Sequence, residues 1–247
     1  MHKVKRTVKP GLTPKMKKDR LAFALKYKDW TLDDWKSVCF SDETSVVLGH
    51  RRGADKVWRT KEEAYDPTVM KRRWKGYSEF MFWGCFSYNF KGPCHVWVKE
   101  TAAERKKAQK EIDQLNAERE ADCKTQWELE TGTKRINLDR PGKAPTWKFT
   151  KVNGKLERCK GAGGVDWWRY RTQILKAKMI PFAVKHGLVI QQDNAPSHRE
   201  KYNQELLQRC GFEVMNWCGN SPDLNAVEPA WYWMKKESIK YRDWEYK

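Results

Sequence analysis

The apolar runs of this chain are no longer than a β-strand, and two of them stop at an aspartate. Val38-Cys39-Phe40 leads into Ser41-Asp42, and the run LVIQQ at 188–192 stops at Asp193. A transmembrane helix needs roughly 20 consecutive apolar residues, and no segment approaches that length. Short β-rich runs that alternate with helical patterns are typical of a sheet covered by helices. The sequence therefore predicts a mixed α/β fold without a membrane-spanning helix, which argues against a membrane partner.

The first half of the chain is rich in expected strands. A basic lead-in or linker segment, residues 1–37, contains a helix, turn and helix from residue 20, with Thr31 as the cap of the second helix. We expect β-rich runs at 37–40 and 45–49 around an acidic turn at 41–44, a strand at 79–90, a turn at 91–93 and a hairpin partner at 94–100.

The second half begins with a change of composition. Residues 101–122 form a strongly helical but highly charged segment that lacks a broad apolar stripe, so it is expected to project into solvent. We interpret residues 101–164 as an insertion into a domain of residues 38–247. The elements expected after it are a helix at 166–185 broken near Pro181, a strand at 188–192, a helix at 198–209, a short strand at 212–217 and a helix from Val227.

The charge balance points to a polyanionic partner. Lys and Arg number 50 against 32 Asp and Glu, a net charge of +18. Neutralised phosphates release counterions, so nucleic acid is the first candidate and an anionic membrane surface the second. The basic N-terminus lacks the apolar core of a secretory signal, and the seven scattered cysteines include no C-x-x-C pair. These features indicate reduced thiols, an intracellular protein and, with DNA as substrate, a nuclear location.

Three acidic residues stand where strands end or helices begin: Asp42, Asp193 and Glu228. Carboxylates from adjacent strands can face one cleft at the end of a sheet. Converging carboxylates repel one another unless a proton or a cation intervenes, and oxygen ligands favour Mg²⁺ or Mn²⁺. Two such ions about 3.5–4 Å apart can activate a nucleophile and stabilise the leaving oxygen of a phosphodiester. Each residue alone would be read as a helix cap or turn former.

The sequence motifs around these three residues resemble those of the Tc1/mariner transposases. WKSVCFSDETSVVLG is similar to that family's first catalytic strand, VIQQDNAPSH to its second motif and SPDLNAVEPAWYWMKK to its third. The 34 residues between Asp193 and Glu228 are the spacing of the Tc1 branch, and the charged insertion resembles fungal versions. The resemblance implies an RNase H-like fold, a catalytic and metal-binding triad of Asp42, Asp193 and Glu228, cleavage of DNA by water and transfer of a 3′-hydroxyl.

The resemblance leaves alternatives open. No paired helix-turn-helix modules precede Lys9, and relatives continue further beyond Lys236, so a truncated or domesticated DNA-binding relic without catalysis is the alternative function. A third reading is an RNase H-like nuclease or an integrase of another lineage. The family also implies a homodimer, for which the sequence gives no independent sign.

Further residues are predicted to contact DNA. Trp74 lies among four cations, and aromatic rings interleaved with cations can stack on bases. Asn194 and His198 follow the second aspartate, where they can contact a phosphate, orient a water or cap a helix. The predicted nucleic-acid-binding residues are Lys71, Arg72, Arg73, Trp74, Lys75, Asn194 and His198.

Overall fold

The computed structural model describes residues 12–48, 78–138, 145–158, 165–215 and 217–240. The chain divides into two compact units: Met1–Val98 with Arg169–Lys247 form unit 1, and Lys99–Trp168 form unit 2. No helix in the described ranges is both long and apolar enough to cross a membrane. The boundaries predicted at residue 37 and for the insertion at 101–164 stay predictions.

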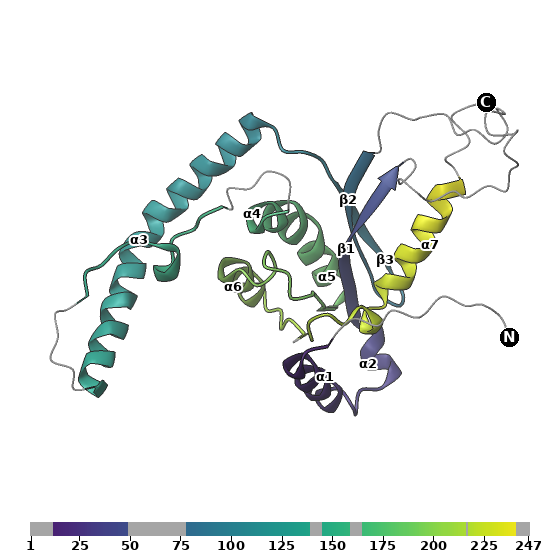
Figure 1. Cartoon of the computed structure of the whole chain (residues 1–247), viewed down its shortest axis with the longest axis horizontal. Coiled ribbons are helices and arrows are strands. Elements are labelled where there is room, and N and C mark those ends of the chain that lie inside the picture. The colour runs from purple at the N-terminus through teal and green to yellow at the C-terminus, as the bar shows by residue number, and fades with distance from the viewer. Residues whose placement is uncertain (1–11, 49–77, 139–144, 159–164, 216, 241–247) are drawn as a thin grey trace, which may run out of the picture. The chain divides into compact units, whose positions relative to one another are not determined.

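Unit 1 is built around a mixed four-stranded sheet (Figure 1). Its spatial order is β3-β2-β1-β4, in which β1 pairs antiparallel with β2 and parallel with β4. This is the α/β class that the sequence predicts. The strands are β1 (Val38–Leu48), β2 (Ser78–Phe86), β3 (Lys91–Trp97) and β4 (Val189–Ile190).

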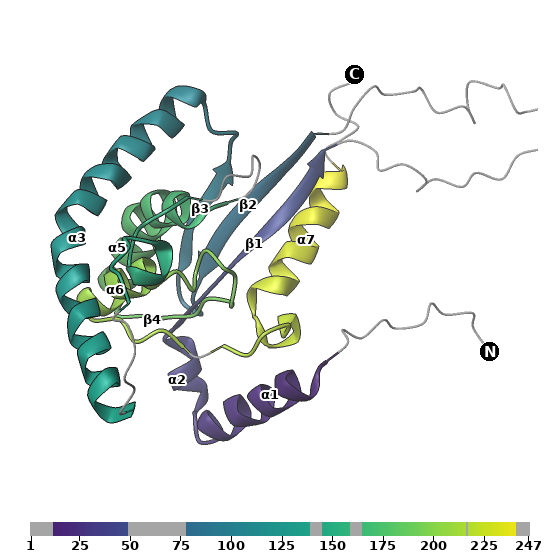
Figure 2. The same cartoon turned by 60° about the vertical axis from the view of Figure 1, so that its left-hand side comes forward.

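Helices cover both faces of this sheet (Figure 2). One face carries η3 (Tyr170–Met179) and α5 (Ile180–His186), which follow the short α4 (Trp167–Arg169). The other face carries α7 (Val227–Lys240), which packs against β1. The helix α6 (Lys201–Arg209) belongs to the same side as α5 in both views. The sheet is therefore the central layer of unit 1.

Two expected turns are wrong. The predicted acidic turn at 41–44 is the middle of one continuous strand, because β1 pairs with β2 without interruption from Phe40 to Leu48. The expected turn at 91–93 lies inside β3, and the hairpin turns instead through backbone bonds between Ser87 and Phe90. Pairing along the whole strand satisfies the backbone groups of polar residues as well as apolar ones, so polarity did not mark the turn.

Two further expectations need correction. The helix does not break at Pro181, because the wide π-type turns of η3 lead directly into α5 with helical angles at Met179 and Ile180. Wider turns accommodate the missing proline N–H. The expected strand at 212–217 is not a strand in its described residues, although Met215 N donates to Ile190 O at 3.2 Å and so joins this segment to β4.

The lead-in helices pack onto the same core as the sheet. They are α1 (Pro14–Lys26) and α2 (Leu32–Lys36), and Thr31 caps α2 with a reciprocal capping box, as predicted. Phe23 of α1 and Tyr27, which directly follows this helix, belong to one buried cluster with Phe40 and Trp217. Edge-on aromatic contacts such as Phe23–Trp217, 5.0 Å between centroids, stabilise this cluster beyond the area they bury.

Unit 2 is a long helix with a return segment. The helix α3 (Ala102–Leu138) carries a narrow buried stripe at Ala108, Ile112 and Asn116, spaced by four residues. Asn116 donates to the Leu156 carbonyl at 2.9 Å and accepts from the Leu156 N–H at 2.7 Å. The returning chain, which includes η2 (Lys151–Asn153), thus covers a stripe too narrow to stand out in the charged sequence.

Candidate active site

Asp42 lies in the middle of β1, on the face covered by α7. Its cross-strand partner is Gly84 of β2, where a Cβ atom would lie only 2.9 Å from the ring of Trp231. The absence of a side chain at Gly84 therefore lets α7 approach the sheet beside Asp42. Trp231 is buried and meets Phe82 edge-on at 5.6 Å between centroids, which fixes this approach.

A buried asparagine ties the start of α7 to β1. The Asn225 amide donates to the Ser41 carbonyl at 3.4 Å, and its side-chain oxygen accepts from the Val227 N–H at 3.3 Å. Its backbone carbonyl accepts from the Glu228 N–H at 3.1 Å. One side chain therefore caps the helix and holds the turn that carries Glu228 against the strand that carries Asp42.

The neighbouring carboxylate, Asp223, has a structural role. It lies in the short turn η4 (Pro222–Leu224) and receives two bonds from the Arg20 guanidinium, at 2.9 and 2.7 Å. Arg20 also donates to Ser221 at 2.7 Å. The lead-in helix α1 thus braces the loop before α7, and Glu228 remains the candidate acid of this segment.

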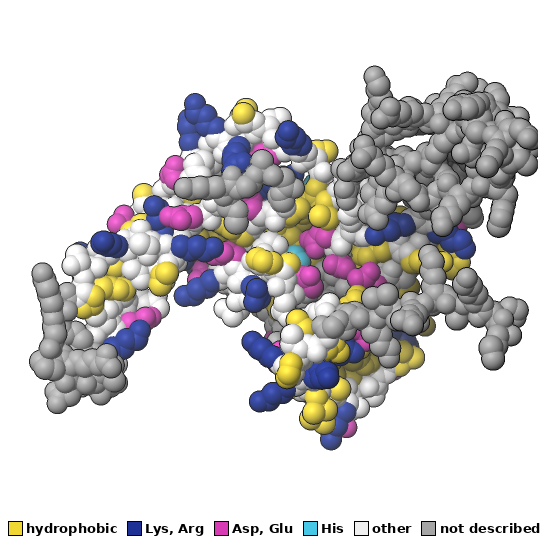
Figure 3. Space-filling view, in the orientation of Figure 1, with side chains coloured by type: hydrophobic (Ala, Val, Ile, Leu, Met, Phe, Trp, Pro, Cys, Tyr) yellow, Lys and Arg dark blue, Asp and Glu magenta, His cyan; other side chains and the backbone are white. Residues whose placement is uncertain are grey.

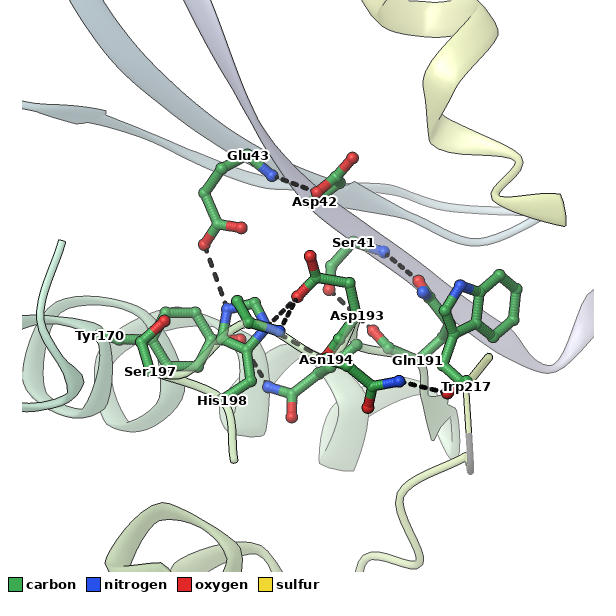
Figure 4. Close-up of polar contacts among 12 residues, drawn as sticks. Ser41, Asp42, Glu43, Tyr170, Gln191, Asp193, Asn194, Ser197, His198 and Trp217 are labelled. Atoms are coloured by element: carbon green, nitrogen blue, oxygen red, sulfur yellow. Dashed lines mark hydrogen bonds and ion pairs between the residues drawn. The ribbon is translucent and has the colours of Figure 1, made fainter. Parts of the chain in front are cut away.

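The segment that leads to the second aspartate, Asp193, is joined to β1 by a buried pair of bonds (Figure 4). Gln191 accepts from the Ser41 N–H at 3.0 Å with its side chain and from the Ser41 hydroxyl at 2.8 Å with its backbone carbonyl. These bonds extend the pairing of β1 with β4 to the residues just before Asp42 and Asp193. The two predicted catalytic aspartates therefore come from adjacent, mutually anchored segments.

A buried histidine joins two of the acidic side chains. His198 Nδ1 lies 2.6 Å from Asp193 Oδ1, and its Nε2 lies 3.4 Å from Glu43 Oε1. Figure 4 shows the Glu43 side chain directed to the ring and Asp42 directed away from it. The ring of His198 also rests against Tyr170, 4.2 Å between centroids. Consecutive residues of a strand point to opposite faces, so Glu43 and Asp42 have separate partners.

The electrostatics separate these carboxylates. Burial by itself would lower the pKa of His198, but its bonds to Asp193 and Glu43 raise that pKa to about 10, so the ring is a cation at neutral pH. Burial works to raise the pKa of Asp193, but the bond and charge of His198, with smaller contributions from the Ala195 N–H and Arg199, together outweigh burial and lower that pKa. Asp193 is therefore an ionised carboxylate held in a fixed orientation.

Asp42 has the opposite environment. Burial, followed by the charges of Glu43, Asp193 and Glu228, raises its pKa to about 7, against a bond from the Glu43 N–H that lowers it. The three predicted catalytic carboxylates thus influence one another electrostatically. Figure 3 shows acidic side chains gathered beside a histidine in the middle of the visible face. Such a group is half protonated near neutral pH unless a cation is bound.

The donor set suits a hard divalent cation. Carboxylate oxygens are the ligands that Mg²⁺ and Mn²⁺ prefer, and a cation would oppose the charges that raise the Asp42 pKa. The bonds from His198 and the Ala195 N–H both reach Oδ1 of Asp193. Within the described ranges, no three acidic, cysteine or histidine side chains are close enough together to hold a metal ion as they stand.

Pockets adjoin two of the predicted residues. One of about 560 Å³ is lined by Asp193, His198 and Arg199, and another of about 630 Å³ by Asn225, Glu228 and Tyr232. Both are rimmed by polar and apolar side chains and belong to unit 1.

The predicted DNA-binding residues have different outcomes. The cluster Lys71–Lys75 lies outside the described residues. His198 is buried within the ion pairs above, and the Asn194 amide donates to the Trp217 carbonyl at 2.5 Å. Only His198 is thus enclosed by the protein, whereas Asn194 is exposed, and the DNA contacts of both residues stay predictions.

Comparison with known proteins gives the class of this fold and site. A family model described as DDE superfamily endonuclease matches residues 152–247, which include Asp193 and Glu228. The structure is similar to the Mos1 transposase in its paired-end complex with the left transposon end (TM-score 0.50, 16% identity, 96% of this chain, 53% of that chain). It is also similar to the Mos1 strand transfer complex (TM-score 0.51, 14% identity, 99% and 58%). Unit 1 therefore has the RNase H-like fold of these transposases.

Sequence relatives define the group more closely. The Tcb2 transposase of Caenorhabditis briggsae is 24% identical over 227 residues, 90% of this chain and 59% of that protein. The Tc1 transposase of Caenorhabditis elegans is 23% identical over 235 residues, 94% of this chain and 62% of that protein. The chain is therefore similar to the Tc1/mariner transposases, as its motifs predict, and it spans about 60% of the length of these relatives.

Sequence reasoning missed the residues that position the site. The sequence alone assigned no role to Glu43, Gly84 or Arg20. A signal was present for one of them, because an isolated glycine within a strand-like run is a recognised sign of close backbone approach. Long-range partners such as Trp231 for Gly84 and Asp223 for Arg20 are not written in the local pattern.

Proposed function

We propose that this chain is the catalytic part of a DNA transposase that cleaves DNA strands with a divalent metal and transfers a 3′-hydroxyl to target DNA. The observation that supports this proposal is that hydrogen bonds tie the segments of Asp193 and Glu228 to the strand of Asp42, so that the charges of both acids reach the buried Asp42 carboxyl group. The catalytic domain would comprise residues 38–247 with 101–164 as an insertion. A homodimer and a nuclear location remain predictions.

Asp42, Asp193 and Glu228 would hold the metal, Mg²⁺ or Mn²⁺, as two ions. When bound, the metal supplies Lewis-acid activation of water or a 3′-hydroxyl and stabilisation of the leaving oxygen. The chain's own groups prepare the ligands. His198 keeps Asp193 ionised and oriented, and Asn225 sets the position of the turn that carries Glu228.

The overall charge has a matching role. A net charge of +18 attracts the phosphates of DNA towards carboxylates that would otherwise repel them. The reaction would therefore use the overall positive charge to attract DNA and the local acidic site to bind the metal. If the three acids were only helix caps or turn formers, the two features would have no shared role.

The test is cleavage and strand transfer on short linear and supercoiled DNA with Mg²⁺ or Mn²⁺. Asp193→Asn and Glu228→Gln should each lower the rate by at least about a thousandfold, since metal ligation supplies several kcal/mol of stabilisation. Asp33→Asn, a change of an exposed carboxylate on α2, should leave the rate unchanged. A chelator should abolish the activity of all active forms.

The alternative function is a DNA-binding relic without catalysis. It predicts that DNA binding is equal in the unmodified chain and in both variants, while none of them cleaves with either metal. That combination would overturn the enzymatic proposal. Cleavage that survives both substitutions would instead show that the reaction uses other residues.

A further inference from the structure

Helix α7 carries two exposed aromatic side chains just beyond the predicted catalytic glutamate. Tyr232 is 65% exposed and Trp233 is 57% exposed, whereas Trp231 beside them is buried. Among the residues that the structure describes, both rings thus leave more than half of their surface uncovered. Exposed apolar groups of this kind commonly mark a binding surface for a partner with an apolar face.

The arrangement of these rings places one of them in the pocket of Glu228. Residues four apart lie on the same face of a helix, so Tyr232 follows Glu228 along that face at about 6 Å. Both line the pocket of about 630 Å³, together with Asn225 and Pro229. A group that binds the Glu228 carboxylate in this pocket therefore lies beside the Tyr232 ring.

Cationic charge accompanies the second ring. Lys236 Nζ lies 4.8 Å from the centroid of the Trp233 ring, and the two aromatic rings meet edge-on at 6.1 Å. A ring flanked by an ammonium group suits a ligand that is aromatic and carries a negative charge. A nucleotide has both properties: its base can stack, and its phosphate attracts the cation.

We propose that Tyr232, supported by Trp233 and Lys236, is a stacking platform for an unpaired base of the DNA strand held at Glu228. This inference rests on the proposed function and adds a residue that grips the substrate. A base inside a duplex is already stacked on its neighbours, so the platform serves a base that has left the stack or belongs to a single-stranded end. Its effect is sequence-tolerant, because every base has a flat face.

The experiment is fluorescence anisotropy with two labelled DNAs, a short duplex with an unpaired 3′ extension and the same duplex with blunt ends, measured without metal so that nothing is cleaved. Tyr232→Ala should weaken binding of the extended DNA about tenfold, the scale of one lost base–aromatic stack, and leave the blunt DNA unchanged. Tyr232→Phe should retain the affinity, since it keeps the ring.

Tyr88→Ala is the matched control. Tyr88 is 66% exposed and has Lys36 Nζ at 5.1 Å from its ring centroid, but it lies in the hairpin turn between β2 and β3. The Tyr88→Ala variant should bind both DNAs with the affinity of the unmodified chain. Equal loss by Tyr88→Ala and Tyr232→Ala would overturn the proposal, because any exposed ring beside a lysine would then suffice.

Other results separate the platform from the rival surface and from the proposed reaction. If Tyr232→Ala binds both DNAs normally but converts a dimer to a monomer in sedimentation, the surface joins two copies and the platform is rejected. If the unmodified chain never cleaves DNA, yet prefers the extended DNA through Tyr232, the platform stands and the proposed reaction fails. If the unmodified chain cleaves DNA and Tyr232→Ala binds the extended DNA normally, the proposed reaction stands and the platform is rejected.

Discussion

The two units treat clustered carboxylates in opposite ways. In unit 2, Glu100 and Asp166 share the guanidinium of Arg158, at 2.9 and 2.6 Å, and the Arg158 side chain is only 5% exposed. In unit 1, Asp42 stands among three further carboxylates, and its pKa is raised to about 7. His198 is the cation that pairs with two of them, Glu43 and Asp193.

The difference separates a structural cluster from a reactive one. In unit 2 the Arg158 guanidinium pairs with both Glu100 and Asp166, although burial costs Arg158 part of its hydration. The negative charges of these acids are therefore balanced by a cation of the chain itself. In unit 1 the folded chain retains an electrostatic cost at Asp42, which an external cation can relieve. Catalytic and ligand-binding sites commonly retain an unfavourable electrostatic energy of this kind, whereas ion pairs that only stabilise the fold do not.

The largest expected effect is the loss of the shared cation in unit 2. Arg158→Met removes the cation that the largely buried Glu100 and Asp166 side chains share and should lower the free energy of unfolding by about 3–5 kcal/mol. Denaturant unfolding followed by circular dichroism measures this change. Lys155→Met, which removes a more exposed pair with Glu157, should cost less than about 1 kcal/mol.

A combined variant tests the cause. Adding Glu100→Gln and Asp166→Asn to Arg158→Met removes the two acidic charges that Arg158 balances in the unmodified chain, so most of the lost stability should return. Persistent loss in the triple variant would mean that Arg158 acts by packing, and the contrast between the two clusters would not hold.

A glycine substitution should have opposite signs in the two units. Gly84→Ala places a Cβ atom 2.9 Å from the Trp231 ring, so α7 must shift, at a cost of about 1–3 kcal/mol. Because that helix carries Glu228, the rate of DNA cleavage should fall as well. Gly132→Ala in α3 meets no atom within 4 Å and should stabilise the chain by up to about 1 kcal/mol. Thermal unfolding with a cleavage assay compares them, and equal effects at both positions contradict the close-approach argument.

Removing the charge at Asp42 should stabilise unit 1 in the absence of metal. The pKa of this group is about 7 in the folded chain against its ordinary value of 3.8, so the folded state holds the proton more tightly. The resulting cost is absent below about pH 4, grows as the pH rises to about 7 and is constant above it. Asp42→Asn should therefore match the unmodified chain near pH 4 and exceed its free energy of unfolding by up to about 4 kcal/mol near pH 8, since each pKa unit corresponds to about 1.4 kcal/mol.

Metal addition sharpens the same comparison. A bound divalent ion stabilises the folded state of the unmodified chain, so Mg²⁺ should narrow the difference from Asp42→Asn at about pH 8. Denaturation curves at both pH values, with and without Mg²⁺, provide the measurement. A variant that is less stable than the unmodified chain at high pH would contradict the raised pKa of Asp42.

The sequence predicted much of this arrangement where the signal was local. The strand before Asp193, the start of α7 at Val227 and the cap at Thr31 follow from apolar runs and capping residues, and the structure confirms them. The fold class follows from their order. The catalytic roles of Asp42, Asp193 and Glu228 stay predictions, since they rest on motif resemblance and on proximity.

The errors have a common physical origin. The polar residues around Asp42 suggest a turn that would divide β1, yet cross-strand hydrogen bonds do not depend on side-chain polarity. The stripe of α3 escapes the sequence pattern because three buried residues in a charged helix barely change its periodicity. The distant pairs that position the site depend on the folded topology, which a single sequence does not state.

The smallest expected effect compares two arginines with the same bidentate geometry. Arg20 binds Asp223 as Arg158 binds Glu100, but the Arg20 and Asp223 side chains are 25% and 59% exposed. Solvent screens this pair, so Arg20→Ala should cost below about 1 kcal/mol, and added salt should reduce that cost further. Denaturation at low and high salt, with Arg158→Met in parallel, measures both. A loss for Arg20→Ala as large as that for Arg158→Met would mean that burial does not set the strength of these pairs, and the proposed distinction between the two clusters would lose its basis.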